Sequence, residues 1–267
     1  MINQLFMSKS ALFAFQRKLQ VISANIANSQ TTGYKRRRAD LESLFPIVFE
    51  GALTDSDETI NSPDKKRKRY TEYGTGVRVA DVSKDFTSGT VEITNQPLDL
   101  AIDGNGFLQF RLPDGTLAYS RAGNLHMSYD GTLVDSGGHP LEPPIQIPRN
   151  STDIIINEEG RVFVQISGQT NPSEIGQILL ANFPNPEGLR DFGQNLYAQT
   201  ASSGDPTYDT PGLNGVGKIK QRALEFSNVN VIAEMMDMIV TQRSFELIVK
   251  TIQAGEAMLK ASSDLGK

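Results

Sequence analysis

The two ends of the chain, separated by most of its length, carry the same helical pattern of apolar side chains. With Ser8, Gln242 and Glu256 as polar members, the positions recur at alternating spacings of three and four residues, as in a helix that packs against another helix. The N-terminal stripe consists of Leu5, Leu12, Phe15, Leu19, Ile22 and Ile26, and the C-terminal stripe of Val231, Met235, Met238, Phe245, Val249, Ile252 and Leu259. We predict that these residues form contacts within a subunit and with neighbouring copies. The pattern favours an assembling structural protein over an enzyme.

The charge of the chain is unevenly distributed. Residues 1–45 are net positive and residues 223–267 net negative, while the whole chain carries a formal charge of −5. Opposite charges favour lateral or antiparallel pairing of the ends, although exposed ion pairs contribute only about 0.2–1 kcal/mol each. The acidic total disfavours a general nucleic-acid binder. We therefore interpret the basic runs at 35–38 and 65–69 as solvated, or as contacts to acidic neighbours.

Three absences narrow the classes of protein further. The sequence contains no cysteine, so disulfides and thiolate chemistry are excluded. No apolar run reaches the roughly 18 residues that a membrane span needs. Polar and basic residues interrupt the apolar ones in residues 1–26, so no secretory signal peptide is readable. We expect that the protein, if it leaves the cytoplasm, does so by another route.

The N-terminal stripe predicts a helix over residues 3–28, with Gly33 as a left-handed cap. The last helix is predicted to begin at Asn228 or Asn230, because asparagine is a preferred N-cap. Residues 46–73 contain Pro, Gly and runs of like charge, and we interpret them as an extended or flexible connector.

Between the ends, apolar and polar residues alternate, which predicts β-structure. The clearest hairpin runs from Leu108 to Tyr119 around Pro113-Asp114-Gly115, and Ser202 to Gly217 is predicted to be a loop. The fold class is therefore α+β, with paired terminal helices as a coiled-coil-like core and an inserted all-β domain. We divide the chain into a helical assembly core (1–34 and 224–267), a connector region (35–74 and 206–223) and an outer β domain (75–205).

No motif in the sequence makes a convincing chemical site. Residues 212–219 resemble a phosphate-binding loop, but Ile219 stands where a Mg²⁺-binding Ser or Thr is needed. Residues 103–107 hint at calcium, yet they lack the twelve-residue loop pattern and fit a tight turn. The two histidines have no partner at metal-ligand spacing, and no nucleophile-elbow motif accompanies a serine triad. We predict no catalytic, cofactor-binding or metal-binding residues.

Segments 23–36 and 224–246 resemble the terminal signatures of the flagellar rod, hook and hook-basal-body protein family. The matching residues are Asn25, Asn28, Thr31, Thr32, Gly33, Tyr34 and Lys35 near the start, and Ser227, Asn228, Val229, Gln242 and Arg243 near the end. Segments 98–107 and 119–124 are similar to the family as well. Segments 195–197 and 211–215 are most similar to its distal rod type.

The resemblance implies a structural subunit, not an enzyme, that self-assembles into a helical tube transmitting torque from motor to hook. The terminal helices would pair in the inner core of the tube, with the β domain outside. The implied partners are further copies of the chain, proximal rod proteins, hook or hook-basal-body proteins, periplasmic and outer-membrane ring proteins, and the flagellar export apparatus, without nucleic acid. The implied location is the bacterial basal body, crossing the periplasm, reached by type III flagellar export without a cleaved signal peptide.

Two alternatives remain open at this stage. One is a proximal rod or hook-type subunit, which segments 46–73 and 193–215 would distinguish. The other is a carbohydrate-binding or cell-wall-acting β-domain protein, which as a hydrolase would need paired carboxylates in a cleft. Asp99, Asp103 and Asp130 are available, but all three fit turns or strand ends.

Overall fold

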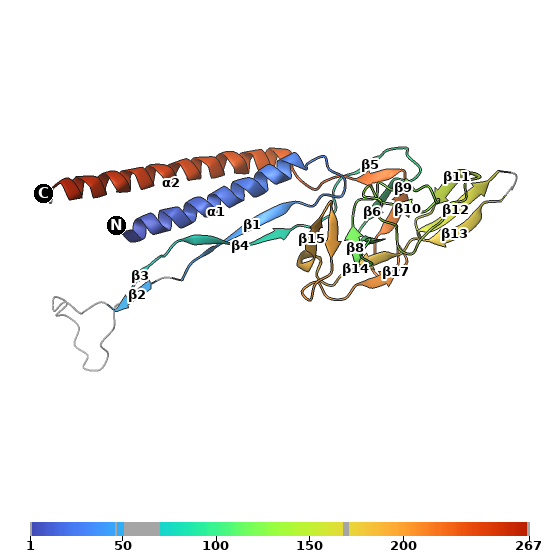
Figure 1. The fold of residues 1–267 in the computed structure, drawn as a ribbon, viewed down its shortest axis with the longest axis horizontal. Helices are drawn as coiled ribbons and strands as arrows, with labels where there is room; N and C mark the ends of the chain where they lie inside the picture. The colour runs from blue at the N-terminus through green and yellow to red at the C-terminus, as the bar shows by residue number, and fades with distance from the viewer. Residues whose placement is uncertain (1, 46, 51–69, 168–170, 266–267) are drawn as a thin grey trace, which may run out of the picture. The chain divides into compact units, whose positions relative to one another are not determined.

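The computed structural model describes residues 2–45, 47–50, 70–167 and 171–265. Two long helices, α1 (Ile2–Ala27) and α2 (Val231–Leu265), flank a series of short strands in the sequence (Figure 1). The fold is thus α+β, as predicted. The chain divides into two compact units: unit 1 comprises Met1–Ser23, Arg38–Ser83 and Met235–Lys267, and unit 2 comprises Ala24–Arg37 and Lys84–Glu234.

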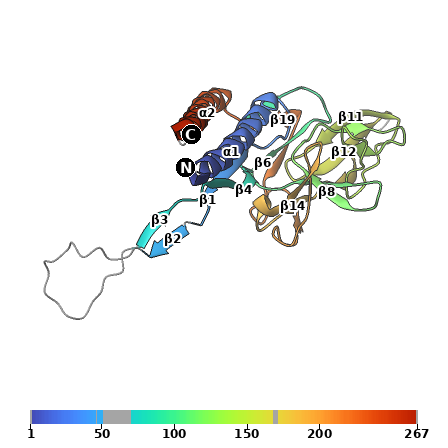
Figure 2. The same ribbon diagram turned by 60° about the vertical axis from the view of Figure 1, so that its left-hand side comes forward.

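Unit 1 contains most of both helices and a ribbon of paired strands. β1 (Arg37–Ser43) pairs with β4 (Val77–Lys84), and further along the ribbon β2 (Ile47–Glu50) pairs with β3 (Tyr70–Tyr73). The start of α1 and the end of α2 lie at the same end of this unit, so the two helices run antiparallel (Figures 1 and 2). Coiled-coil packing between the two helices remains a prediction.

The structure groups the strands of the ribbon differently from the sequence-based division of the chain. Both flanks of the predicted connector form paired strands, and its charged runs at 55–58 and 65–69 lie outside the described residues. The sequence analysis assigns the residues of β4 to the β domain because they alternate between apolar and polar. In the structure, β4 pairs with β1 and groups with the helices. The hydrogen-bonding partner of a strand decides its unit, and a local pattern does not identify that partner.

The helix α1 is anchored on this ribbon. The Val77 N–H donates to Ser10 Oγ at 3.3 Å, and that hydroxyl donates to Met7 O at 2.8 Å. Gly76 has φ +125°, and a Cβ there would lie 2.1 Å from Ser10 Oγ. Glycine therefore allows the close approach of ribbon and helix.

Unit 2 is built from short β-strands. Its largest sheet has the order β15-β16-β8-β7, formed by β15 (Arg190–Gly193), β16 (Leu196–Ala198), β8 (Leu117–Ser120) and β7 (Leu108–Arg111). A three-stranded sheet consists of β11 (Ser151–Ile156), β12 (Arg161–Ile166) and β13 (Ser173–Gln177). Four strand pairs complete the described part of this unit: β5 (Val91–Ile93) with β19 (Ala223–Glu225), β6 (Leu100–Asp103) with β18 (Lys218–Gln221), β9 (His126–Met127) with β10 (Leu133–Val134), and β14 (Leu180–Asn182) with β17 (Thr207–Asp209). A short 3₁₀ helix spans Pro186–Gly188.

The core of unit 2 follows the alternation in the sequence. The predicted hairpin is confirmed as β7 and β8, which place Leu108 and Phe110 in the apolar core. A second cluster is aromatic, and its rings pack edge to face. The ring centroids of Phe107 and Phe183 are 5.8 Å apart, and those of Tyr119 and Phe183 are 4.8 Å apart. Such edge-to-face pairs favour a single arrangement of the rings.

Two loop predictions have different outcomes. The predicted loop from Ser202 to Gly217 contains strand β17, so that prediction was wrong in part, because pairing with β14 overrides the Gly/Pro-rich composition. The turn after Asp103 is confirmed between β6 and β7.

The segment that resembles a phosphate-binding loop does not offer a free lysine. Lys218 Nζ lies 2.7 Å from Glu158 Oε2, so the cation is already paired. Across the described ranges, no group of three metal-ligating side chains occurs. No helix among the described residues is long and apolar enough to cross a membrane.

Candidate assembly site

The two signature segments meet inside unit 2. The helix α1 ends at Ala27, where Asn28 Nδ2 donates to Ala24 O at 2.8 Å. A turn follows, and Gly33 is left-handed, with φ +67°, although it lies six residues beyond the helix. The Gly33 N–H donates to Glu225 O at 2.8 Å, which joins the two signatures. We call the residues that meet here the signature junction, defined as Asn25, Tyr34, Lys35, Arg36, Arg121, Glu225, Asn228 and Glu234.

We expect Gly33→Ala to destabilise the protein by more than about 2 kcal/mol. A left-handed φ alone costs about 1–2 kcal/mol for an L-residue, and the new Cβ would also lie 2.5 Å from the Ala122 nitrogen. The matched control is Gly115→Ala, because Gly115 has φ +83° with no atom near its Cβ position. Urea unfolding compares the two variants. Equal losses would show that the close approach to Ala122 contributes nothing.

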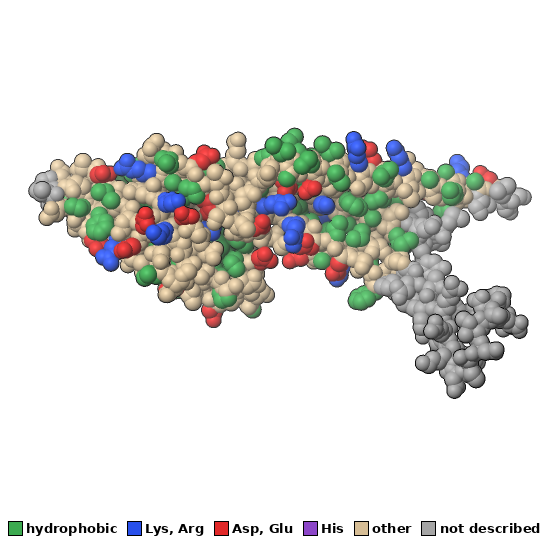
Figure 3. All heavy atoms as spheres, turned by 180° about the vertical axis from the view of Figure 1, so that it is seen from behind, with side chains coloured by type: hydrophobic (Ala, Val, Ile, Leu, Met, Phe, Trp, Pro, Cys, Tyr) green, Lys and Arg blue, Asp and Glu red, His purple; other side chains and the backbone are tan. Residues whose placement is uncertain are grey.

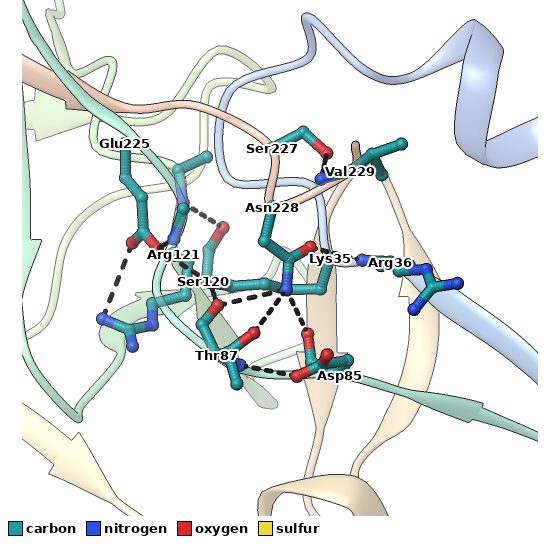
Figure 4. A network of polar contacts seen from close by, with 12 residues as sticks. Lys35, Arg36, Asp85, Thr87, Ser120, Arg121, Glu225, Ser227, Asn228 and Val229 are labelled. Atoms are coloured by element: carbon teal, nitrogen blue, oxygen red, sulfur yellow. Dashed lines mark hydrogen bonds and ion pairs between the residues drawn. The ribbon is translucent and has the colours of Figure 1, made fainter. Parts of the chain in front are cut away.

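A carboxylate between two cations lies at the centre of the junction (Figure 4). Lys35 Nζ is 2.7 Å from Glu225 Oε1, and both side chains are fully buried. Arg121 Nη1 lies 3.6 Å from Glu225 Oε2 and is almost as buried. Lys35 Nζ also donates to Thr87 O at 2.6 Å, and the Gly89 N–H donates to Glu225 Oε1 at 2.9 Å. Two distant parts of the chain are thus joined through one buried carboxylate.

Burial weakens the protonated state of both cations. It lowers the pKa of Lys35, and the attraction of Glu225 opposes that shift. Burial likewise lowers the pKa of Arg121, against the same attraction. Each cation therefore depends on Glu225, because a buried charge without a partner is strongly destabilising. Within the basic run at 35–38, Lys35 is therefore not solvated. It is buried and contacts an acidic residue of the same chain, Glu225.

Asn228 bonds to two other backbone segments (Figure 4). Its Oδ1 accepts from the Arg36 N–H at 2.8 Å. Its Nδ2 donates to Asp85 O at 2.9 Å and to Thr87 Oγ1 at 3.0 Å. Asn228 therefore connects the C-terminal signature to the N-terminal signature and to the segment after β4.

The cap of α2 is Asn230. Its Oδ1 accepts from the N–H groups of Ile232 and Ala233, each at 3.1 Å. Of the two predicted caps, Asn230 is confirmed and Asn228 belongs to the junction.

The first turn of α2 is bonded directly to the last turn of α1. Glu234 Oε2 accepts from Asn25 Nδ2 at 3.1 Å, and Glu234 Oε1 pairs with Arg36 Nε at 2.6 Å. The Tyr34 hydroxyl donates to Asn25 Oδ1 at 3.1 Å. Asn25 and Glu234 are both buried. The roots of the two helices are therefore fixed to each other within unit 2.

The other signature residues have local contacts or lie elsewhere. Thr31 Oγ1 donates to Asn28 Oδ1 at 3.2 Å, Thr32 O accepts from Asn195 Nδ2 at 3.1 Å, and Ser227 Oγ accepts from the Val229 N–H at 3.3 Å. Gln242 and Arg243 are exposed on α2 and are not brought to the junction.

The long helix α2 carries a second apolar face, of which the sequence analysis named only Met235. We call it the exposed α2 face, and it consists of Met235, Met236, Ile239, Val240, Leu247 and Met258, each at least half exposed. Figure 3 shows hydrophobic side chains gathered over the helices. On α1, Phe6 and Phe13 are similarly exposed, at 72% and 59%. Exposed apolar side chains gathered on one side of a helix are typical of an interaction site.

Most of the predicted C-terminal stripe lies on the opposite side of α2. Met238, Phe245, Val249, Ile252 and Leu259 are half-buried, whereas Val231 and Met235 are exposed. The residues of the exposed α2 face cluster on one side of the helix at 100° per residue, and the half-buried residues on the other.

The N-terminal stripe shows a gradient of burial. Ile22 is buried, and Leu12, Phe15, Leu19 and Ile26 are half-buried. The side chain of Leu5 lies outside the described residues. Contacts of these residues with neighbouring copies remain a prediction.

The two terminal helices are hydrogen-bonded to each other where they join unit 2, and both carry exposed apolar side chains. These features are typical of a subunit of a larger assembly. Residues 7–35 match the family described as flagella basal body rod protein. Residues 101–164 match the D1 domain of the flagellar hook protein FlgE/F/G, and residues 220–265 match the flagellar basal body rod FlgEFG protein C-terminal family.

Individual relatives match along their whole length. The flagellar basal-body rod protein FlgG of Buchnera aphidicola from Schizaphis graminum is 43% identical over 265 residues, covering 99% of this chain and 100% of that one. FlgG of Caulobacter vibrioides is 40% identical over 258 residues, 96% of each chain. FlgG of Bacillus subtilis is 34% identical over 266 residues, 97% of each chain. The chain belongs to the flagellar basal-body rod protein family, which confirms the resemblance of its signatures.

Proposed function

We propose that the protein is a structural subunit of the flagellar distal rod, where copies assemble into a helical tube that transmits torque from motor to hook. The observation that carries the proposal is the exposed α2 face, which a single subunit leaves in water. The full-length match to rod proteins named FlgG supports it.

The driving force would be burial of the helix faces between copies. Fully burying one Leu, Ile or Met side chain contributes about 1.5–3 kcal/mol. Five such residues and Val240 lie on the exposed α2 face, and Phe6 and Phe13 add more on α1. Contacts between different surfaces of successive copies do not close into a ring and so generate a helix. The half-buried stripes of α1 and α2 would complete a coiled-coil core in the assembled tube.

The partners follow from this role. Besides further copies of itself, the subunit would contact proximal rod proteins at one end and hook or hook-basal-body proteins at the other. The periplasmic and outer-membrane ring proteins would surround it, and the flagellar export apparatus would deliver it without a cleaved signal peptide.

The described residues support a role in cell-wall hydrolysis less than a structural role, because two of the candidate carboxylates already have partners. Asp99 accepts a hydrogen bond from Thr94 Oγ1 at 2.6 Å, and Asp103 pairs with Lys220 at 2.7 Å. Both carboxylates thus have partners at strand ends. A proximal rod or hook-type role is the nearer alternative, and the names of the full-length relatives favour the distal rod over it.

Electron microscopy of the purified chain over a concentration series tests the proposal. We expect tubes or helical filaments from the natural chain and none from Leu19→Asp or Phe245→Asp, because each would bury an unpaired carboxylate in the helical core. Circular dichroism checks that the strands of each variant remain folded. Filaments from either folded variant would refute the assignment of these stripes.

A further inference from the structure

One carboxylate outside the signature junction lies between two cations at the root of the ribbon. Asp191 is on β15, an edge strand of the four-stranded sheet. Its Oδ2 is 2.6 Å from Arg37 Nη2 and 2.9 Å from Lys84 Nζ. Arg37 begins β1 and Lys84 ends β4. A single oxygen therefore bridges the two strands where the ribbon starts, and all three residues belong to unit 2.

The surroundings hold these charges in place. Lys84 Nζ lies 4.3 Å from the centre of the Tyr197 ring, and the Arg37 guanidinium lies 5.9 Å from that of Tyr34. Both distances are within the range of cation–π attraction. The other carboxylate oxygen of Asp191 accepts from the Gly193 N–H at 3.1 Å. The side chain of Lys84 is only 12% exposed, so its ammonium group is shielded from water and depends on its protein partners.

The titration behaviour agrees with this arrangement. Burial raises the pKa of Asp191, but the hydrogen bond and charge of Lys84, together with Gly193 and Arg37, outweigh it and bring the pKa below its ordinary value. Burial lowers the pKa of Lys84, and Asp191 opposes that shift. The carboxylate is therefore ionised at neutral pH.

The ribbon needs an anchor at this point. A two-stranded ribbon by itself is marginally stable in water, because it buries little apolar surface. Beyond the paired strands, the backbone bond from Asp85 N to Arg36 O at 2.9 Å continues the pairing into unit 2. Asp191 adds a side-chain link from the sheet to both strands at the same place.

We propose that Asp191 is a positioning residue that clamps the root of the β1–β4 ribbon through Arg37 and Lys84. The clamp holds the start of β1 and the end of β4 on the sheet of unit 2. In the rod it keeps the root of each subunit's ribbon paired as copies assemble, a consequence that rests on the proposed function. The clamp itself is a property of the free subunit.

Hydrogen exchange of the soluble full-length chain tests the clamp. We expect Asp191→Asn to increase amide exchange of residues 37–43 and 77–84 about tenfold, which corresponds to about 1.4 kcal/mol of lost local stability. Exchange in the rest of unit 2 should remain unchanged. The matched control is Asp153→Asn, because Asp153 also accepts a backbone N–H and pairs with an arginine, at 3.8 Å, in an exposed site.

A double-mutant cycle separates the clamp from ordinary packing of β15. Arg37→Gln and Lys84→Gln should each raise amide exchange of the ribbon by part of the amount expected for Asp191→Asn. Adding either substitution to Asp191→Asn should raise the exchange no further. These single variants also carry the test if Asp191→Asn does not fold. Unchanged exchange in the ribbon, a general rise across unit 2, or additive effects would each overturn the proposal. A wild-type chain that forms no filaments would contradict the rod function and leave this result intact.

Discussion

Replacing Lys35 with methionine is expected to lower the free energy of unfolding by about 3–5 kcal/mol. Removing one partner of a buried ion pair leaves the other charge uncompensated, and this is among the most destabilising single changes known. Glu225 would retain Arg121 at 3.6 Å and the Gly89 N–H at 2.9 Å, but it would lose its closest cation. Domains are stable by only about 5–15 kcal/mol, so the loss would be a large fraction of the total.

Urea unfolding followed by circular dichroism measures this loss. The control is Lys218→Met, because Lys218 also lies 2.7 Å from a glutamate, but in an exposed site. Exposed ion pairs contribute little, so the control should unfold at nearly the natural urea concentration. A similar loss in both variants would show that burial of the Lys35–Glu225 pair is unimportant.

Replacing Ile239 with aspartate is expected to abolish assembly and leave the free subunit unchanged. Ile239 is 51% exposed in the subunit, and exposed substitutions usually change stability by less than about 0.5 kcal/mol. In an assembled rod the same position would bury an unpaired carboxylate, which costs several kcal/mol. Each 1.4 kcal/mol is a factor of ten, so the concentration needed for assembly should rise at least about 100-fold.

Sedimentation of polymers over a concentration series, with thermal unfolding of the subunit, checks this expectation. Phe245→Asp is the informative comparison, because Phe245 is half-buried within the subunit. We expect that variant to lose stability in unit 1 as well as assembly, while the strands of unit 2 remain folded. Normal polymers from Ile239→Asp would mean that the exposed α2 face is not an interface.

Local patterns in the sequence predict the elements well where they decide the structure alone. The first helix is predicted over residues 3–28 and spans Ile2–Ala27, because its apolar spacing and lack of Gly and Pro are local properties. The hairpin of β7 and β8 follows in the same way from alternation around Pro113-Asp114-Gly115.

The junction could not be predicted, because its partners are distant in the sequence. Lys35 and Glu225 are 190 residues apart, and nothing in either segment identifies the other as a partner. The basic run at 35–38 likewise gives no sign that Arg37 pairs with Asp191, which lies on a distant strand. The same limit explains β4, whose pattern predicts a strand and not its pairing with β1.

Except for Met235, the residues of the exposed α2 face were missed for a different reason. Between Val231 and Val249 the helix is apolar on most sides, so one stripe at alternating three and four spacing does not exhaust its apolar surface. That stripe passes through Met238 and Phe245, which the subunit itself half-buries. Met236, Ile239 and Val240, one or two residues further round the helix, remain in water.

The central claim is that the exposed α2 face becomes buried between copies in the rod. The chain contains no cysteine, so Ile239→Cys introduces a single thiol for labelling. We would measure its maleimide reactivity in the purified subunit and in intact purified basal bodies, with dissolved basal bodies as the control for total thiol. The account predicts a reactive thiol in the subunit and in the dissolved sample, and a protected thiol in the intact rod. Equal reactivity in the subunit and the intact rod would contradict it.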